Sequence, residues 1–423
     1  MKIGFLSLPL SGHLNPMTAL ARKLQMRGNE VVFFGVPDAE PIVRAAGLNF
    51  ALYSEKEYPV GSIAKDFAPL AKLHGREVGR YSCKEINPPF GKAALANLPG
   101  KLAETGVEAL VIDTFHFFVE LAAMSMGIPY VHIWNFLPID FSASTPPCFF
   151  SWPHDISPEG IARNVTGLQL VADDLGPVFA FGMAYAEKAG LKIDWSNPAA
   201  TASKLAVISQ IPKEFDFPDT PRPAHFHYTG PFHDDKGRES VPFAWEKLTG
   251  KPLIYASLGT LVNGSDHVYK AILEAVAKLP DVQVVLSIGT NVNPDDLGLI
   301  PSNTIIVRSA PQIELLKRAA LCITHAGLNT ALESLAQGVP MVAIPIAYDQ
   351  PGVAARIAHH GVGEFLNLED LTEERLFGLI QKVLNDAGYR DKAHYFQKVI
   401  AETRGLDIAA DVIEQAFRKA SST

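Results

Sequence analysis

The clearest structural pattern in this chain is the stretch Leu321-Cys-Ile-Thr-His-Ala-Gly-Leu-Asn-Thr-Ala-Leu-Glu-Ser-Leu-Ala-Gln-Gly338. Its short apolar run, residues 321–324, predicts a buried strand, and residues 329–337 predict a helix that Gly338 closes. A strand that leads directly into the N-terminus of a helix is the repeating unit of proteins with parallel sheets. The stretch therefore predicts an α/β fold.

The junction between this strand and this helix suits an anion. Small Ala326 and Gly327 let backbone N–H groups approach a ligand, and the helix macrodipole favours negative charge at this end. His325, Asn329 and Thr330 each add a side-chain hydrogen-bond donor. A diphosphate is the natural occupant of such a site.

Further polar residues extend this site towards a nucleotide and a sugar. Glu333 lies one helical turn beyond the phosphate-facing residues, where its carboxylate can accept from both hydroxyls of a ribose. Asp349 and Gln350 follow the next apolar strand, residues 341–344, at the sheet edge where doubly wound folds bind ligands. Each residue alone has a structural explanation, since His325 could satisfy a strand end and Asp349 a turn. Their order favours a common ligand, a nucleotide sugar.

The N-terminal half predicts a second sheet of the same kind. A buried strand, residues 2–8, leads through a loop to an amphipathic helix, residues 17–27, with Asn15 as N-cap and Pro16 at the first helical position. His13 is then expected in the loop, at the carboxyl edge of the sheet and facing a ligand. Strand and helix patterns continue at residues 31–36, 109–113, 119–126 and 129–133.

The first loop points to acid–base chemistry. It lacks the Gly-x-Gly-x-x-Gly pattern, so a nicotinamide or flavin enzyme has little support. A histidine beside a helix start is often only structural, but Asp113 ends the strand 109–113 at the same sheet edge and can accept a hydrogen bond from the ring. Such a pair would fix the tautomer and stabilise the imidazolium as His13 takes a proton from a hydroxyl.

Together these motifs resemble the signature of the inverting UDP-glycosyltransferases. The matching segments are Gly12-His13, Asp113, Pro311-Gln312, His325-Ala-Gly327, Asn329-Thr330, Glu333, Gly338-Val-Pro340 and Asp349-Gln350. The resemblance implies the GT-B fold, an α/β architecture in which two Rossmann-like parallel-sheet domains face each other across a cleft. It also implies that His13 and Asp113 are catalytic, that a nucleotide sugar is the donor and that no metal is needed.

The resemblance also assigns the donor-binding residues. Grouped by the part of the donor that they would bind, these are His325, Asn329 and Thr330 for the diphosphate, Glu333 for the ribose, Asp349 and Gln350 for the sugar, Ala310 and Gln312 for the base, and Gly12, Gly327, Ser257, Gly259 and Thr260 around the diphosphate. The stretch 257–260 could instead be a simple turn at the end of a strand.

Two positions depart from the plant members of the family. Those members begin the motif with a tryptophan that stacks on uracil, where this chain has Ser309, and they carry a second tryptophan where it has Leu328. Such substitutions are familiar in microbial members. They leave room for a thymidine diphosphate sugar in place of UDP-glucose, the donor that Gln350 beside Asp349 favours.

Length and composition indicate a large two-domain enzyme. A chain of 423 residues is longer than one hydrophobic core usually supports, and a hydrophobic content of 48% is enough for two cores. The predicted parts are an acceptor-binding domain (1–236), a linker (237–251), a nucleotide-sugar domain (252–400) and a C-terminal helix (401–423) that packs back on the first domain. Strands of the second domain are expected at 253–257, 282–288, 304–307, 321–324 and 341–344. The tail from 391 to 419 has helical periodicity.

Charge and cysteine content exclude other classes of protein. The formal charge of −8, without basic clusters, argues against a nucleic-acid surface. Three cysteines, odd in number and outside any metal-ligand spacing, indicate a reducing compartment. The chain starts with a strand rather than a signal sequence, and no apolar run reaches about 18 residues. We therefore expect a cytoplasmic protein.

Aromatic and proline residues concentrate between 134 and 153. Trp134, Phe136, Phe149 and Phe150 are the candidate acceptor-binding side chains, because aromatic residues in a loop suit an apolar ligand. Packing beneath a long loop explains them equally well. This segment resembles bacterial zeaxanthin glucosyltransferases, which implies a carotenoid or similar lipophilic alcohol as acceptor and peripheral contact with a membrane to reach it.

The expected reaction is glucosyl transfer from UDP-glucose to a hydroxyl of a lipophilic acceptor such as zeaxanthin, with inversion. A transferase for a macrolide or polyphenol that uses a UDP or TDP sugar would have the same active site. A nucleotide-sugar epimerase should need added carboxylates near the anomeric carbon. A non-catalytic sugar-nucleotide-binding subunit would not need both His13 and Asp113.

Overall fold

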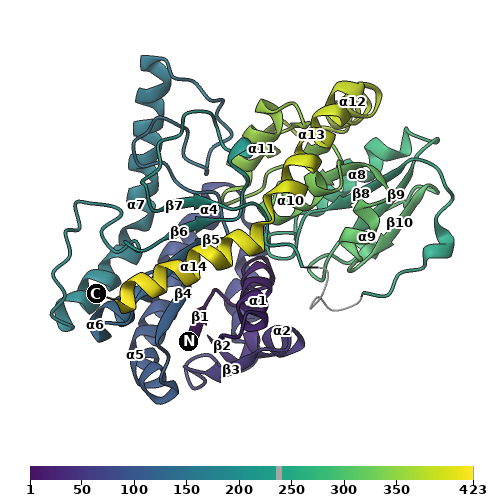
Figure 1. The fold of residues 1–423 in the computed structure, drawn as a ribbon. Helices are drawn as coiled ribbons and strands as arrows, with labels where there is room; N and C mark the ends of the chain where they lie inside the picture. The colour runs from purple at the N-terminus through teal and green to yellow at the C-terminus, as the bar shows by residue number, and fades with distance from the viewer. Residues whose placement is uncertain (235–240, 423) are drawn as a thin grey trace.

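The computed structural model describes residues 1–234 and 241–422, which form two parallel sheets with helices packed against them (Figure 1). The first sheet has seven strands in the order β3-β2-β1-β4-β5-β6-β7. Their bounds are β1 Lys2–Leu6, β2 Glu30–Gly35, β3 Asn49–Leu52, β4 Ala109–Asp113, β5 Tyr130–Trp134, β6 Val207–Ser209 and β7 Phe226–Tyr228. The helices of this half are α1 Ser11–Met26, α2 Glu40–Ala45, α3 Ser62–Phe67, α4 Arg76–Tyr81, α5 Asn87–Thr105, α6 Glu120–Met126 and α7 Pro158–Lys188.

The second sheet has six strands in the order β10-β9-β8-β11-β12-β13. Their bounds are β8 Leu253–Ser257, β9 Gln283–Ser287, β10 Thr304–Val307, β11 Ala319–Thr324, β12 Met341–Ala343 and β13 Gly363–Phe365. The helices are α8 Asp266–Ala277, α9 Gln312–Leu316, α10 Leu328–Ala336, α11 Gln350–His359, α12 Glu373–Asn385, α13 Ala387–Thr403 and α14 Gly405–Ser421. Within the predicted linker, residues 237–240 lie outside the described residues.

In each sheet the strand order reverses once, between β1 and β4 in the first and between β8 and β11 in the second. Ligands bind outside the carboxyl ends of the strands at such a reversal, because the connecting chains diverge there and leave a crevice. Asp113 ends β4, Ser257 ends β8, and His325 directly follows β11. The topology therefore brings the polar residues predicted from the sequence to the two crevices.

The start of α1 differs from the expectation that Asn15 caps a helix beginning at Pro16. The helix begins at Ser11 and carries Pro16 in its second turn, so His13 lies in the first turn rather than in a loop. Pro16 has no N–H to donate to the carbonyl of Gly12, which would cost a hydrogen bond in an isolated helix. Here the Gly12 carbonyl accepts from Nδ2 of Asn329 at 2.7 Å, so the second half of the chain satisfies it.

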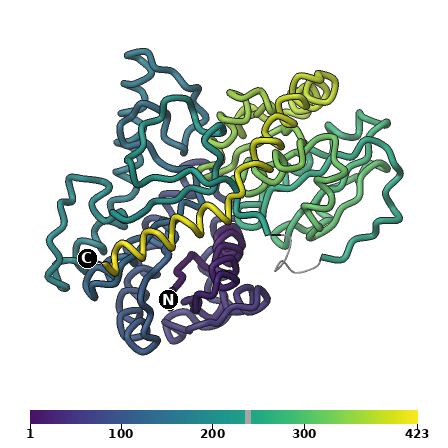
Figure 2. The backbone as a smooth tube through the Cα atoms, in the orientation of Figure 1, coloured from purple at the N-terminus to yellow at the C-terminus, as the bar shows by residue number. Residues whose placement is uncertain are grey.

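The C-terminal tail is two helices rather than one. Arg404 has a left-handed backbone (φ 46°) that ends α13 and turns the chain into α14. This last helix, yellow in Figure 2, runs back across the first half. Its Phe417 is fully buried among the side chains of the first sheet and α1, and Arg27, directly after α1, pairs with Asp411 at 2.6 Å. The helix thus completes the core of the first half.

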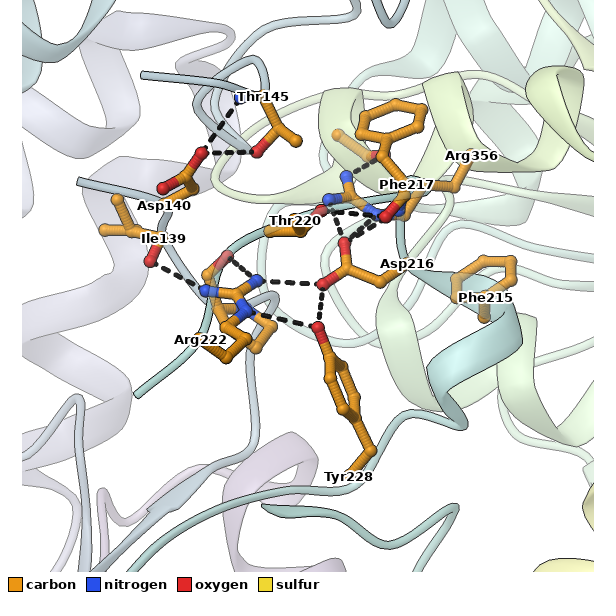
Figure 3. A network of polar contacts seen from close by, with 12 residues as sticks. Ile139, Asp140, Thr145, Phe215, Asp216, Phe217, Thr220, Arg222, Tyr228 and Arg356 are labelled. Carbon is orange, nitrogen blue, oxygen red and sulfur yellow. Dashed lines mark hydrogen bonds and ion pairs between the residues drawn. The ribbon is translucent and has the colours of Figure 1, made fainter. Parts of the chain in front are cut away.

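A buried ionic network ties the halves together at Asp216 (Figure 3). Its carboxylate accepts from Arg356 of α11 at 2.7 Å, from Arg222 at 2.8 Å and from the Tyr228 hydroxyl at 2.6 Å. Burial alone would raise the pKa of Asp216, but the two guanidinium groups hold it well below its usual 3.8. Arg222 also donates to the carbonyl of Ile139 at 3.0 Å, so the network reaches the loop after β5.

Phe417→Ala should lower the free energy of unfolding by about 3–5 kcal/mol, because it removes a fully buried aromatic side chain from the core of the first half. Urea unfolding followed by circular dichroism measures the change. Ile408→Ala, at a 39% exposed position of the same helix, is the control and should cost much less. Equal effects of the two substitutions would contradict a core role for α14.

Asp216→Asn should destabilise the protein by about 3–5 kcal/mol, since it leaves two buried guanidinium groups without their shared counter-charge. The same unfolding experiment tests this. Asp219→Asn is the control, because Asp219 is exposed and asparagine tolerates its left-handed backbone (φ 58°). A loss no larger than that of the control would show that the network is energetically neutral.

Candidate active site between the two sheets

A cavity of about 510 Å³ lies between the carboxyl ends of the two sheets. It is lined from the first half by Gly12, His13 and Phe136. From the second half it is lined by Ser257, Gly259, Thr260, Ala310, Gln312, His325, Gly327, Asn329, Thr330, Glu333, Asp349 and Gln350. Every residue that the sequence assigned to the donor therefore borders one cavity, although the roles within it stay predictions.

His13 and Asp113 form a hydrogen-bonded pair at the wall of this cavity. His13 Nδ1 lies 2.7 Å from Oδ2 of Asp113, which is fully buried and also accepts from the Ser7 hydroxyl at 3.0 Å. Oδ1 of the same carboxylate accepts the Phe115 N–H at 3.1 Å. Because an ionised carboxylate only accepts, Nδ1 carries the proton and Nε2 keeps a free lone pair. The ring is thus oriented to act as a base.

Burial and charge act in opposite directions on this pair. Burial disfavours protonation of His13, but the charge of Asp113 and the hydrogen bond to it raise the pKa of His13 above 6.5. Burial likewise would raise the pKa of Asp113, but His13 and the hydrogen bonds to the carboxylate hold it below 3.8. Asp113 therefore stays ionised, and an imidazolium at His13 is stabilised.

The ring of His325 packs closely against Gly259 and Gly327, and a side chain at either glycine would collide with it. A Cβ atom on Gly259 would lie 2.6 Å from His325 Nε2, and one on Gly327 would lie 2.5 Å from the same atom. Gly259 also has a left-handed backbone (φ 75°). Burial lowers the pKa of His325 to about 4, and its Nδ1 has no hydrogen-bond partner among the described residues. The ring is therefore a neutral hydrogen-bonding group at the start of α10.

Gln312 and Glu333 belong to one hydrogen-bonded group. Gln312 Nε2 donates to Glu333 Oε2 at 2.6 Å and to the Thr330 hydroxyl at 3.3 Å, while Gln312 Oε1 accepts from the Tyr255 hydroxyl at 3.0 Å. The side chain of Gln312 thus orients the carboxylate expected to bind a ribose. The assignment of Gln312 to the base stays a prediction, and the sequence analysis did not single out Tyr255.

Several donor-site residues contact the first half directly. Thr260 shares a 3.2 Å hydrogen bond with Ser11, and Gln210 Nε2 donates to Asn329 Oδ1 at 3.0 Å. Asp349 accepts the backbone N–H of Leu137 at 2.9 Å, and burial raises the pKa of Asp349 to about 6. These contacts span the cleft, so the two halves are closed on each other. The sequence carries no local pattern that identifies Gln210 or the Leu137 amide.

Three of the four aromatic residues predicted to bind an acceptor lie together: the rings of Phe136 and Phe149 are 5.7 Å apart, and Phe115 contacts both Trp134 and Phe136. Trp134 and Phe149 line a second, largely apolar cavity of about 490 Å³ in the first half, and Phe136 lines the cleft cavity. Phe150 borders neither of these cavities within the described residues. It stacks on Trp152 with ring centroids 4.0 Å apart. This contact agrees with the alternative that the aromatic residues of this segment pack beneath a long loop.

The two cavities adjoin at Phe115 and Phe117, because both residues line both of them. The ring of Phe115 lies 6.5 Å from that of His13 and 4.0 Å from that of Phe136. Sequence reasoning missed this pair. Their position directly after Asp113, at the end of a predicted strand, was the available signal.

Within residues 1–234 and 241–422, clusters of metal-binding side chains and membrane-spanning helices are both absent. No three histidine, cysteine or carboxylate side chains come together there in a group that could hold a metal ion. No helix in the same part of the chain is long and apolar enough to cross a membrane. The cytoplasmic location stays a prediction.

Comparison with known proteins agrees with this geometry. The chain is 26% identical to a zeaxanthin glucosyltransferase from Pantoea ananas, over 97% of this chain and 94% of that one. It is 27% identical to the NDP-glycosyltransferase YjiC from Bacillus subtilis (strain 168), over 99% and 98% of the two chains. The solved structure of the glycotransferase of kitacinnamycin superposes with a TM-score of 0.75 at 24% identity, over 98% of this chain and 99% of that one.

The last comparison confirms the expected architecture, the two parallel-sheet domains of the GT-B fold. Residues 196–419, more than half of the chain, match the protein family described as "UDP-glucoronosyl and UDP-glucosyl transferase". The enzyme class expected from the sequence is confirmed as well. The chain belongs to the UDP-glucoronosyl and UDP-glucosyl transferase family.

Proposed function

We propose that this glycosyltransferase transfers glucose from UDP-glucose to a hydroxyl of a lipophilic acceptor such as zeaxanthin, with inversion at the anomeric carbon. The observation that carries the proposal is the His13–Asp113 pair at the wall of the cleft cavity, which adjoins an apolar second cavity at Phe115 and Phe117. A base at this boundary can act on a hydroxyl whose apolar body occupies the second cavity.

The reaction follows from the hydrogen bonds of the pair. His13 Nε2 takes the proton of the acceptor hydroxyl while Nδ1 donates to Asp113, whose charge stabilises the imidazolium. The hydroxyl oxygen forms a bond to the anomeric carbon from the side opposite the diphosphate, and the bond to the diphosphate oxygen breaks. In-line displacement inverts the configuration.

The leaving diphosphate needs stabilisation of its developing charge. The N-terminus of α10 directs backbone N–H groups and the positive end of the helix dipole towards the cavity. Neutral His325 and the hydroxyl of Thr330 lie at the same end. These groups would serve in place of a divalent cation, and we propose that the reaction is independent of metal.

The second cavity supports a lipophilic acceptor. Its walls come mainly from apolar residues of β5, α7 and the loop after β5. Phe141 and Val165 line it and are also 47% and 55% exposed, so the cavity opens to the surface beside apolar side chains. This opening would suit entry of an apolar alcohol from solution or from a membrane surface.

The donor and acceptor are tested together by mass spectrometry after incubation with UDP-glucose and a panel of lipophilic alcohols that includes zeaxanthin, without added metal. We expect a hexose adduct of zeaxanthin or of a related carotenoid. An adduct only on a macrolide or polyphenol would overturn the carotenoid acceptor. A product that forms only with a TDP sugar would overturn the UDP donor and agree with Ser309 in place of the tryptophan that stacks on uracil.

His13→Ala should lower kcat by about 10²- to 10⁴-fold, as expected for the loss of a general base. Binding of UDP should change little, which isothermal titration calorimetry measures. His74→Gln, at an exposed position, is the matched control. If UDP binding is lost together with activity, His13 holds the structure of the cleft instead of acting as base.

The pH dependence of kcat/KM tests the role of Asp113. Activity requires neutral His13, whose pKa is raised, so kcat/KM should fall as the pH drops through a value above 6.5. Asp113→Asn removes the charge that raises this pKa, and the acidic limb should move to lower pH. If the acidic limb of the Asp113→Asn variant stays at the same pH, then Asp113 does not control the pKa of His13.

A further inference from the structure

Two buried ionisable side chains stand out in the apolar second cavity. Glu120, at the start of α6, is 6% exposed, and His132, in the middle of β5, is 3% exposed. Both line the cavity opposite the apolar wall of α7. Neither takes part in the proposed proton transfer. A polar pair at such a place needs an explanation, because burying polar groups without partners costs free energy.

The hydrogen bonds of His132 define its tautomer. The backbone N–H of Ser203 donates to His132 Nδ1 at 3.2 Å, so Nδ1 holds a lone pair and Nε2 carries the hydrogen. This Nε2–H has no hydrogen-bond partner within the described residues. The nearest carboxylate oxygen, Oε2 of Glu120, lies 4.0 Å away, which is too far for a hydrogen bond.

The two groups do not form an ion pair near neutral pH. Burial raises the pKa of Glu120 to about 7, and this effect is larger than that of a hydrogen bond with Thr201, which lowers the pKa. Burial also lowers the pKa of His132 to about 4, so its imidazole stays neutral. The cavity therefore presents a fixed N–H donor beside a carboxyl group that can accept.

The 4.0 Å gap between Nε2 and Oε2 is the right size for one oxygen atom. An oxygen can lie about 2.9 Å from each of these atoms, because the gap is shorter than the sum of two hydrogen bonds. It would accept from His132 and donate to Glu120. A hydroxyl group does both, whereas a ketone or ether oxygen can only accept.

The pair lies deeper in the first half than the catalytic site. His132 is two residues before Trp134, at the end of β5, which places it about 7 Å further from the sheet edge. Phe115 and Phe117 border both this cavity and the cleft cavity that His13 lines, so the two cavities adjoin at these rings. A rigid molecule with one hydroxyl at His13 would pass these rings to reach the buried pair.

We propose that Glu120 and His132 bind a second hydroxyl group of the acceptor, so that the preferred acceptor is an apolar diol on a rigid skeleton. This inference rests on the proposed function, since it takes the second cavity as the acceptor site. It narrows the acceptor from lipophilic alcohols in general to compact diols whose second hydroxyl lies within the cavity, and it disfavours zeaxanthin within that class, because the two hydroxyls of zeaxanthin lie at opposite ends of a long polyene. A mono-alcohol would leave the His132 donor with no partner on the acceptor.

The test compares estradiol with the analogue that lacks its second hydroxyl and keeps the phenolic one. Binding is measured by calorimetry without donor, and transfer to the phenolic hydroxyl is measured as kcat/KM with UDP-glucose. We expect the wild-type protein to prefer the diol by about tenfold or more in both measurements, because the analogue leaves buried polar groups unpaired.

His132→Phe should reduce the preference for the diol to about twofold or less, while binding of the analogue is kept or improved. Glu120→Gln is the more conservative second variant and should weaken the preference partly. Gln169→Leu is the matched control: Gln169 lines the same cavity but bonds to Asp173, and its variant should keep the wild-type ratio. Melting temperatures of all variants establish that they are folded.

The outcomes separate this inference from the proposed function. Equal binding of the diol and the analogue by the wild-type protein overturns the inference, and so does an equal loss of both ligands in Glu120→Gln, which would assign the pair a structural role. If the wild-type protein prefers the diol in binding but transfers glucose to no acceptor, the hydroxyl site at Glu120 and His132 is supported and the proposed glucosyl transfer is contradicted.

Discussion

The described strands of both sheets pair in parallel, and this constraint places several of the polar groups of the cleft. In a parallel sheet all strands end at the same edge, so the residues that follow them gather there. Asp113 ends β4, Ser257 ends β8, and His325 follows β11. Because hydrogen-bonded strands hold the backbone up to these residues, the site is built at the ends of rigid elements rather than on long loops.

Each half of the molecule leaves polar groups that the other half satisfies. Pro16 frees the carbonyl of Gly12, and Asn329 of α10 donates to it. The carboxylate of Asp349 accepts the backbone N–H of Leu137. His13 in α1 and the residues proposed to bind the donor are thus held by contacts of the same kind. The contacts that hold the two halves together also fix groups of the candidate site.

The acceptor side was the least predictable part of the molecule. Aromatic content pointed to the segment after β5, yet Phe150 packs on Trp152 while Phe115 and Phe117 border both cavities. The composition of a loop does not define which of its rings face a cavity, because the direction of each side chain depends on the helices that cover it. For the same reason no local pattern related Glu120 to His132.

The sequence by itself determined the two parallel sheets and most of the residues that line the cleft cavity, because apolar runs, helix ends and the polar residues between them are local features. His325, Glu333 and Asp113 could be placed from their position after or within single elements. Only the tertiary structure decided that α1 begins at Ser11 and that the tail bends at Arg404. These features depend on contacts between residues far apart in the chain, such as the hydrogen bond across the cleft, and such contacts leave no periodic signal in the sequence.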